Sequence, residues 1–206
     1  MSFFTRGGLL AALLAVAAAP GLCGENERSP GALMDALMWG KEPVGGPFAL
    51  VDQHGRTRTD AEFRGKLVLL YFGYTRCPDV CPADVLSITL ALQSLGERSA
   101  HVQPIFVTLD PEHDTQDLLG DYLSSFDPRW VGLTGAIAAI RKLALDYKVW
   151  FAKSEGAGKN YAIDHTSFIF LVGRDGKYAG FLPPGTPSDR IAEAVSALER
   201  GPPGPP

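Results

Sequence analysis

The chain has 206 residues and a formal net charge of −4 at pH 7, with 46% hydrophobic and 20% charged residues. This composition is that of an ordinary globular protein, and it excludes both wholesale disorder and a membrane protein with several spans. The sequence has no Lys/Arg cluster, so it lacks the basic surface that binding to a nucleic-acid backbone requires.

The N-terminal segment has the layout of an export signal. Arg6 supplies a positive charge, and an apolar run from Leu9 to Ala19 follows. This run is shorter than the roughly 20 residues that a transmembrane helix needs, so residues 1–24 are predicted to be a signal peptide or a membrane anchor. Cys23 stands where a bacterial lipoprotein carries its lipidated cysteine, although Leu22 is untypical before it. Removal of Cys23 with the signal peptide is the favoured alternative.

Residues 25–46 are rich in glycine and proline and are predicted to form a flexible tether. Four apolar residues in this segment share one helical face, which indicates packing or membrane contact rather than a metal site. They are Leu33, Met34, Leu37 and Met38. Residues 47–200 are predicted to form the folded domain, and residues 201–206 a disordered tail.

Apolar patterns predict the elements of the domain in chain order. They are a hairpin of 48–52 and 57–59, a buried strand at 67–72, a helix at 82–95, a second buried strand at 102–109, a helix ending near 126, a helix at 137–147, a hairpin of 168–172 and 178–182, and a last helix carrying Ile191, Val195 and Leu198. This order predicts an α/β fold, a thioredoxin-like sandwich with an added N-terminal β-hairpin.

The two cysteines of the domain, Cys77 and Cys81, lie where the predicted strand 67–72 leads into the next helix. Their spacing brings both sulfurs to one face if the segment turns helically, and a helix N-terminus favours thiolates. Soft thiolate ligands select Cu(I) or Zn(II), but two cysteines alone are incomplete for a structural zinc site. Because disulfides persist in exported proteins, a structural disulfide is the alternative.

A third ligand is sought among four histidines. His54 lies at a turn, His101 precedes a strand and His113 lies in a loop before a helix, so each has a local role. His165 directly precedes the predicted strand 168–172, and a thioredoxin-like fold would place it near the start of a central strand, beside the cysteine loop. We therefore expect two sulfurs and one nitrogen to meet.

Four separated motifs then resemble the Sco/SenC proteins, the copper-handling factors of cytochrome oxidase assembly, over about residues 45–200. The motifs occur in order, which makes the resemblance more specific than any one of them. They are Tyr71 to Pro82 with Cys77-Pro-Asp-Val-Cys81, Asp110-Pro111 with Asp114-Thr115, Gly132 to Gly135, and Asp164-His165.

The resemblance implies a metal site in which Cys77, Cys81 and His165 ligate copper, as Cu(I) or Cu(II). It also implies a metallochaperone that delivers copper to the binuclear centre of cytochrome c oxidase, with the copper-centre subunit as partner and other copper chaperones or thiol reductants as further partners. The two cysteines would cycle between dithiol and disulfide. The expected location is the bacterial periplasm, tethered to the inner membrane.

Two features depart from the family pattern, and one motif residue has a plainer explanation. His113 stands where many relatives carry a basic residue such as Arg, and the N-terminal segment lacks a full-length membrane span. Asp114 is expected to cap the helix that follows it.

The main alternative function is an enzyme, a thiol–disulfide oxidoreductase with Cys77 and Cys81 as its redox pair. Such enzymes normally carry C-x-x-C and a proline before the following strand, whereas this chain has C-x-x-x-C and His165. A thiol peroxidase is disfavoured because its P-x-x-x-T-x-x-C pattern would need Thr and Pro where Tyr74 and Leu70 stand.

Overall fold

A computed structural model describes residues 1, 28–40, 42–154 and 161–200. Apart from Met1, the expected export segment, including Cys23, lies outside the described residues, as does the whole of the expected tail at 201–206.

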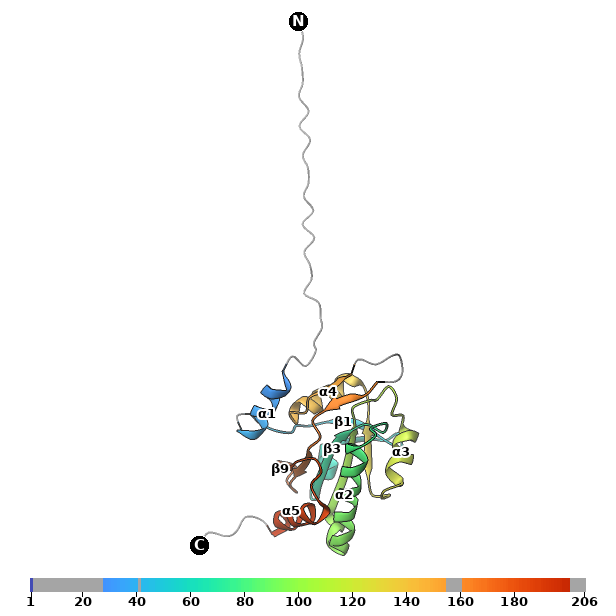
Figure 1. Ribbon diagram of the computed structural model, residues 1–206, viewed down its shortest axis with the longest axis vertical. Helices are drawn as coiled ribbons and strands as arrows, with labels where there is room; N and C mark the ends of the chain where they lie inside the picture. The colour runs from blue at the N-terminus through green and yellow to red at the C-terminus, as the bar shows by residue number, and fades with distance from the viewer. Residues whose placement is uncertain (2–27, 41, 155–160, 201–206) are drawn as a thin grey trace.

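The centre of the domain is a seven-stranded mixed sheet in the order β2-β1-β5-β4-β3-β8-β9 (Figure 1). Its strands are β1 Ala49–Asp52, β2 Thr57–Thr59, β3 Leu67–Gly73, β4 Val102–Thr108, β5 Val131–Thr134, β8 Ile169–Val172 and β9 Tyr178–Leu182. Strands β3, β4 and β5 run parallel, and the outer strands pair antiparallel with them. The predicted α/β class and the added N-terminal hairpin, β1–β2, are confirmed.

Strand β3 lies in the middle because its sequence, LVLLYFG, offers only apolar or small side chains to both faces of the sheet. Every residue of β3 is buried, as the unbroken apolar run predicts for a doubly covered strand. It pairs with β4 on one side and with β8 on the other. The C-terminal end of β3, which leads into the cysteine loop, is therefore anchored in the core.

Five α-helices and two short 3₁₀ helices accompany the described strands. They are α1 Pro30–Met38, η1 Asp60–Phe63, α2 Val80–Leu95, η2 Gly96–His101, α3 Gln116–Ser124, α4 Ile137–Asp146 and α5 Ser188–Arg200. Helices α2 and α5 pack together beside the sheet, α3 contacts β5, and α4 contacts β1 (Figure 1). The core of aromatic and aliphatic side chains lies between these helices and the sheet.

Helix α1 lies inside the segment predicted to be a tether. Ser29 caps it by accepting a hydrogen bond from the Ala32 backbone N–H, and Leu33, Ala36 and Leu37 are buried. Leu33 and Leu37 of the predicted apolar face are thus buried, whereas Met38 is exposed. No helix among the described residues is both long and apolar enough to cross a membrane.

A second, two-stranded sheet was not predicted. Strands β6 Phe151–Lys153 and β7 Ile163–His165 pair antiparallel, with Phe151 opposite His165. The buried side chains of Phe151 and Ile163 join the main core. His165 therefore ends a separate hairpin, the β6–β7 hairpin, and a short connection separates it from strand β8.

Candidate metal centre

The cysteine loop, residues 74–79, runs from the end of β3 to the start of α2. Cys77 is partly exposed, whereas Cys81, in the first turn of α2, is completely buried. Both thiols are free, and the Cys81 backbone N–H points to Cys77 Sγ at 3.5 Å. The sequence predicts both cysteines near a helix N-terminus, and the structure has them there.

His165 reaches the cysteines from the β6–β7 hairpin. Its Nε2 lies 3.5 Å from Cys81 Sγ, although the two residues are 84 positions apart in the chain. The ring of Tyr74 packs edge-on against the imidazole, with the centroids 6.0 Å apart. The three residues singled out in the sequence therefore meet in space, with His165 at the end of β7 rather than at the start of β8.

The orientation of the imidazole leaves one nitrogen for the sulfurs. His165 Nδ1 lies 3.1 Å from the backbone carbonyl oxygen of Thr166, and Ser167 Oγ is 3.3 Å away. A carbonyl oxygen can only accept, so Nδ1 carries the proton and donates it. Nε2 then presents its lone pair to Cys81, which is the arrangement of a histidine that binds a metal.

The two thiols differ in acidity. The hydrogen bond from the Cys81 thiol, together with those from the backbone N–H groups of Asp79 and Cys81, lowers the pKa of Cys77 to about 3, despite partial burial. The pKa of Cys81 is raised because its thiol donates to Cys77 and because it is buried. The pair thus favours a thiolate at Cys77 and a thiol at Cys81, and the two sites titrate together.

Two buried polar groups lie behind Cys81. Asp84 follows it by about one helical turn and accepts a hydrogen bond from the Gly185 backbone N–H at 2.8 Å through Oδ1. Its Oδ2 and the hydroxyl of Tyr71 are buried, and neither has a hydrogen-bond partner within the part of the chain that the structure describes. Burial raises the pKa of Asp84, and burial together with the neighbouring Cys81 and Asp84 raises that of Tyr71. Sequence reasoning missed Asp84, whose position three residues after Cys81 was the available signal.

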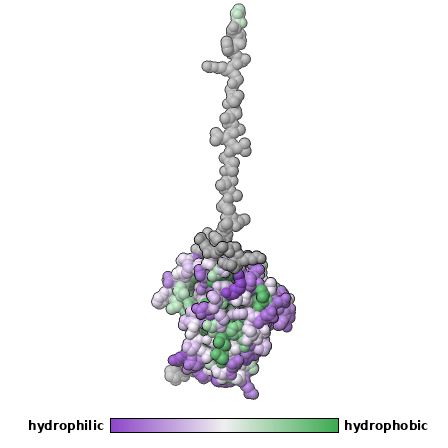
Figure 2. Space-filling model, turned by 45° about the vertical axis from the view of Figure 1, so that its right-hand side comes forward, coloured by the Kyte–Doolittle hydropathy of each residue, from purple (hydrophilic) through white to green (hydrophobic). Residues whose placement is uncertain are grey.

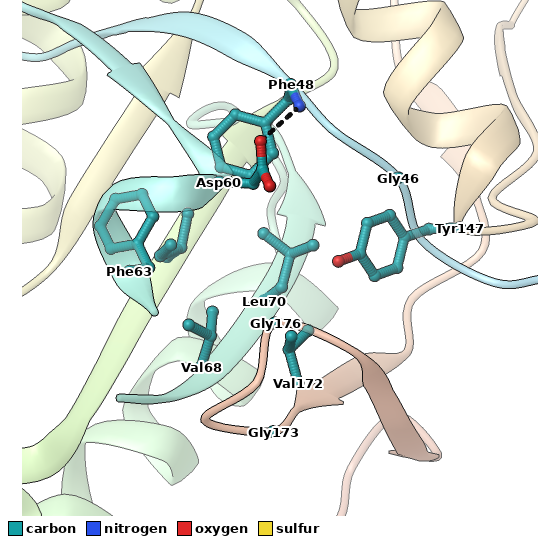
Figure 3. Close-up of a pocket in the computed structure, with 11 residues that line it drawn as sticks. Gly46, Phe48, Asp60, Phe63, Val68, Leu70, Tyr147, Val172, Gly173 and Gly176 are labelled. Carbon is teal, nitrogen blue, oxygen red and sulfur yellow. Dashed lines mark hydrogen bonds between the residues drawn. The ribbon is translucent and has the colours of Figure 1, made fainter. Parts of the chain in front are cut away.

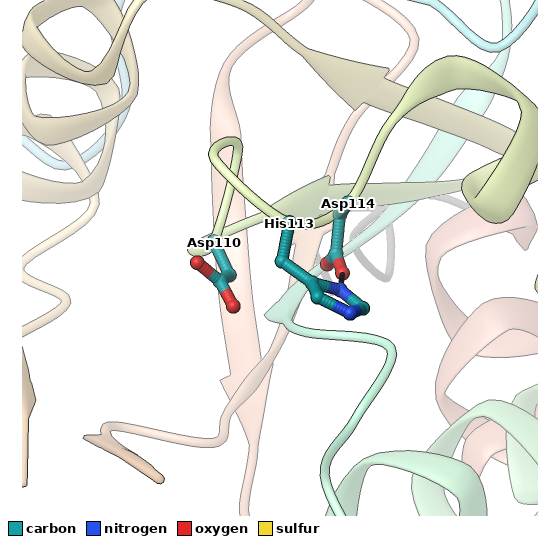
Figure 4. Close-up of side chains that lie close together, drawn as sticks. All are labelled: Asp110, His113 and Asp114. Atoms are coloured by element: carbon teal, nitrogen blue, oxygen red, sulfur yellow. Dashed lines mark hydrogen bonds and ion pairs between the residues drawn. The ribbon is translucent and has the colours of Figure 1, made fainter. Parts of the chain in front are cut away.

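The loop after β4 contributes two buried carboxylates, Asp110 and Asp114, with His113 between them (Figure 4). Asp114 does not cap α3: Thr115 does so, by accepting from the Leu118 backbone N–H. Asp114 instead accepts from the backbone N–H and the hydroxyl of Thr75, at 3.0 and 2.6 Å. The cysteine loop is thus bonded to this neighbouring loop.

The oxygens and nitrogens of Asp110, His113 and Asp114 lie close enough together to suggest a second metal site. The carboxylate oxygens are already engaged, however: Asp110 accepts from Arg76 and Tyr161, and Asp114 from Thr75, Thr108 and His113. A group whose acceptors are all satisfied by protein donors is a hydrogen-bond network, so this cluster is structural.

A small hollow lies elsewhere, against the face of the main sheet that Val68, Leu70 and Val172 form (Figure 3). Its volume is about 30 Å³, close to the share of one water molecule in the liquid. Phe63, Val68, Leu70 and Val172 line it with apolar side chains, and the hydroxyl of Tyr147 points toward it. This space is too small for a substrate. In Figure 2 the visible apolar surface is divided into small patches among polar side chains.

Comparisons with known proteins place this chain in a family. The SCO1/SenC family profile matches residues 38–199. The chain is 39% identical to a SCO2-like protein of Rickettsia prowazekii over 140 residues, which are 67% of this chain and 68% of that one. The profile match thus covers nearly all of the predicted domain of residues 47–200, from β1 into α5.

Solved structures of Sco proteins support the same family. The structure of Bradyrhizobium japonicum ScoI with copper bound is 39% identical with a TM-score of 0.70, covering 75% of this chain and 99% of that one. BsSco, described as a Sco-family cytochrome c oxidase assembly protein with a disulfide switch, is 25% identical with a TM-score of 0.62, covering 78% and 98%. Family profile, curated relative and solved structures all match the same region, and the chain belongs to the SCO1/SenC family.

Proposed function

We propose that the protein is a copper metallochaperone that binds copper through Cys77, Cys81 and His165 and delivers it to the binuclear copper centre of cytochrome c oxidase. The observation that carries this proposal is the 3.5 Å approach of His165 Nε2 to Cys81 Sγ in a free cysteine pair. Two soft sulfurs and a neutral imidazole suit copper, and three donors leave room for a ligand from a partner.

The chemistry of the donors fits a metal that is held and then passed on. Cys77 supplies a thiolate at neutral pH because its pKa is lowered to about 3. Cys81 must lose its proton as the metal binds, and His165 is already turned with Nε2 toward the sulfur. The copper bound to a similar ScoI and the oxidase role described for BsSco support copper delivery. They do not favour the alternative, thiol–disulfide exchange as an enzyme.

The location and partner are part of the proposal. The apolar run at Leu9–Ala19 supports export to the bacterial periplasm with the domain of residues 47–200 tethered to the inner membrane. The recipient is then the copper-centre subunit of the oxidase, which the domain would meet at the surface around the partly exposed Cys77.

A competition titration tests the function. The reduced protein is titrated with Cu(I) against a competing chelator in the absence of oxygen, and the titration is repeated with Cys77→Ser, Cys81→Ser and His165→Ala. We expect one copper per protein, and each substitution should weaken binding strongly. His101→Ala is the matched control, because His101 is exposed and precedes β4 at the end of the sheet opposite the cysteine loop.

The outcomes separate the two functions. If the parent binds Cu(I) no better than a simple dithiol, or if His165→Ala binds like the parent, copper delivery fails. Turnover of a disulfide substrate by such a protein would then support the oxidoreductase.

A further inference from the structure

The β6–β7 hairpin that carries His165 has little sheet structure of its own. Each strand has three residues, and the two strands pair only with each other among the described elements. A two-stranded sheet of this size is not stable by itself. Its position on the domain, and with it the position of His165, must come from contacts outside the hairpin.

One such contact is a closed triangle of three side chains. Tyr161, two residues before β7, donates its hydroxyl to Asp110 Oδ1 at 2.6 Å. Arg76 donates to Asp110 Oδ2 at 2.9 Å, and the Arg76 guanidinium lies over the Tyr161 ring, 4.5 Å from its centroid. Each side chain therefore contacts the other two.

The triangle joins the two halves of the metal centre. Arg76 directly precedes Cys77. Tyr161 lies four positions before His165, just ahead of strand β7. Asp110, between them, belongs to the loop after β4 and is completely buried. Its charge is paired inside the protein by Arg76, and charge-assisted hydrogen bonds of this kind are stronger than neutral ones.

A second cation strengthens the same attachment. Lys153, the last residue of β6, lies 4.4 Å from the centroid of the Tyr161 ring and pairs with Glu112 at 2.7 Å. Glu112 belongs to the same loop as Asp110. Both strands of the hairpin are thus fastened to this loop by polar contacts, in addition to the apolar packing of Phe151 and Ile163.

We propose that Arg76, Asp110 and Tyr161 form a polar latch that holds the β6–β7 hairpin against the cysteine loop and thereby keeps His165 beside Cys81. The proposal rests on the proposed function and deepens it, because the latch residues are positioning residues and touch no copper. With the latch closed, the three proposed copper ligands, Cys77, Cys81 and His165, lie together. When the Tyr161–Asp110 bond opens, the hairpin carries His165 away and the copper is left on two sulfurs, from which a recipient removes it more easily.

The substitution Tyr161→Phe tests the latch. It removes the hydroxyl that bonds Asp110 and keeps the ring that packs against Arg76 and Lys153. We expect the Cu(I) affinity to fall about 10-fold, as for other residues that orient a metal ligand, and copper transfer to a chelator to accelerate. Tyr178→Phe in β9, at the far edge of the main sheet, is the matched control.

A double substitution separates positioning from general stability. If the latch acts through His165, Tyr161→Phe will not weaken Cu(I) binding further in a protein that already carries His165→Ala. Amide hydrogen exchange is the second readout: the exchange of the Ser154 and Thr166 backbone N–H groups, which donate across the hairpin to the carbonyl oxygens of Ala162 and Trp150, should accelerate in Tyr161→Phe while that of β3 stays unchanged.

The failures of the two proposals are distinguishable. If His165→Ala weakens Cu(I) binding but Tyr161→Phe matches the parent in affinity and in hairpin exchange, the latch is wrong and copper delivery stands. An additive loss in the double variant also overturns the latch. If neither the cysteine nor the histidine substitutions affect copper binding, the proposed function itself is wrong.

Discussion

The sulfur side and the nitrogen side of the site are held in different ways. Cys81 is sealed in the core beneath β3, whose seven residues are all buried. His165 is partly exposed and ends a three-residue strand. The sulfurs are therefore placed by packing, which changes only if the core changes. The nitrogen is placed by a few polar contacts and by the packing of Phe151 and Ile163, so fewer contacts would have to break for this half of the site to move.

The largest effect should come from breaking the sulfur side. Cys81→Ser removes a soft ligand. The binding free energy of a structural Zn²⁺ ion with four ligands is about 10–16 kcal/mol, so we expect the loss of one such ligand to lower the affinity about 100-fold or more. We expect His165→Ala to cost less than Cys81→Ser, because two sulfurs remain. Cu(I) competition titrations measure both, and equal losses would contradict the proposed difference between the two sides.

The acidity of the pair predicts the next largest effect. Cys77, with a pKa of about 3, is a thiolate at neutral pH, whereas the raised pKa of Cys81 keeps its proton there. Binding copper with both thiolates must then release one proton, so Cu(I) affinity should rise about 10-fold per pH unit between roughly pH 6 and 8. The rise follows from proton loss at Cys81, since Cys77 does not titrate in this range.

Affinities measured across this range, with a chelator whose own pH dependence is known, give the slope. A flat profile would mean that both thiols are already ionised. A slope of two protons would mean that Cys77 is protonated as well.

A small effect is expected from crowding the sulfur side. A methyl group at Gly73 would lie 3.0 Å from Cys81 Sγ and equally close to two ring carbons of Phe106. Overpacking of this kind costs about 1–3 kcal/mol of unfolding free energy, and we expect Gly73→Ala to lower Cu(I) affinity only a few-fold. Gly31→Ala is the control, because a methyl group there meets no atom within 4 Å. An unchanged free energy of unfolding in Gly73→Ala would show that the Phe106 ring moves aside without loss of stability.

The sulfur side could be predicted because its signals are local. The apolar run of β3, the cysteine spacing and the periodic helix after it are all continuous in the sequence, and α2 begins two residues earlier than predicted. Burial on both faces of a central strand leaves few other arrangements for such a segment.

The nitrogen side could be predicted only in part. His165 was singled out from its place in the sequence. Strands β6 and β7 were not predicted, because they are too short to show a periodic pattern and because their pairing joins two segments that are not adjacent in the sequence. The hydrogen bonds of Asp114 to Thr75 and of Tyr161 to Asp110 span 39 and 51 positions. Nothing in a single sequence ties such residues together, which is why Asp114 was expected to cap a helix.

The unequal burial of the two cysteines gives the site a direction. Cys77 is open to solvent, whereas Cys81 has no exposed surface. In the proposed delivery, an incoming ligand of a recipient protein would meet the metal from the Cys77 side, and Cys81 would be the donor that it reaches last. Ligand exchange would then proceed stepwise from the outside inward, and the metal stays bonded to at least one protein until the new coordination sphere is complete.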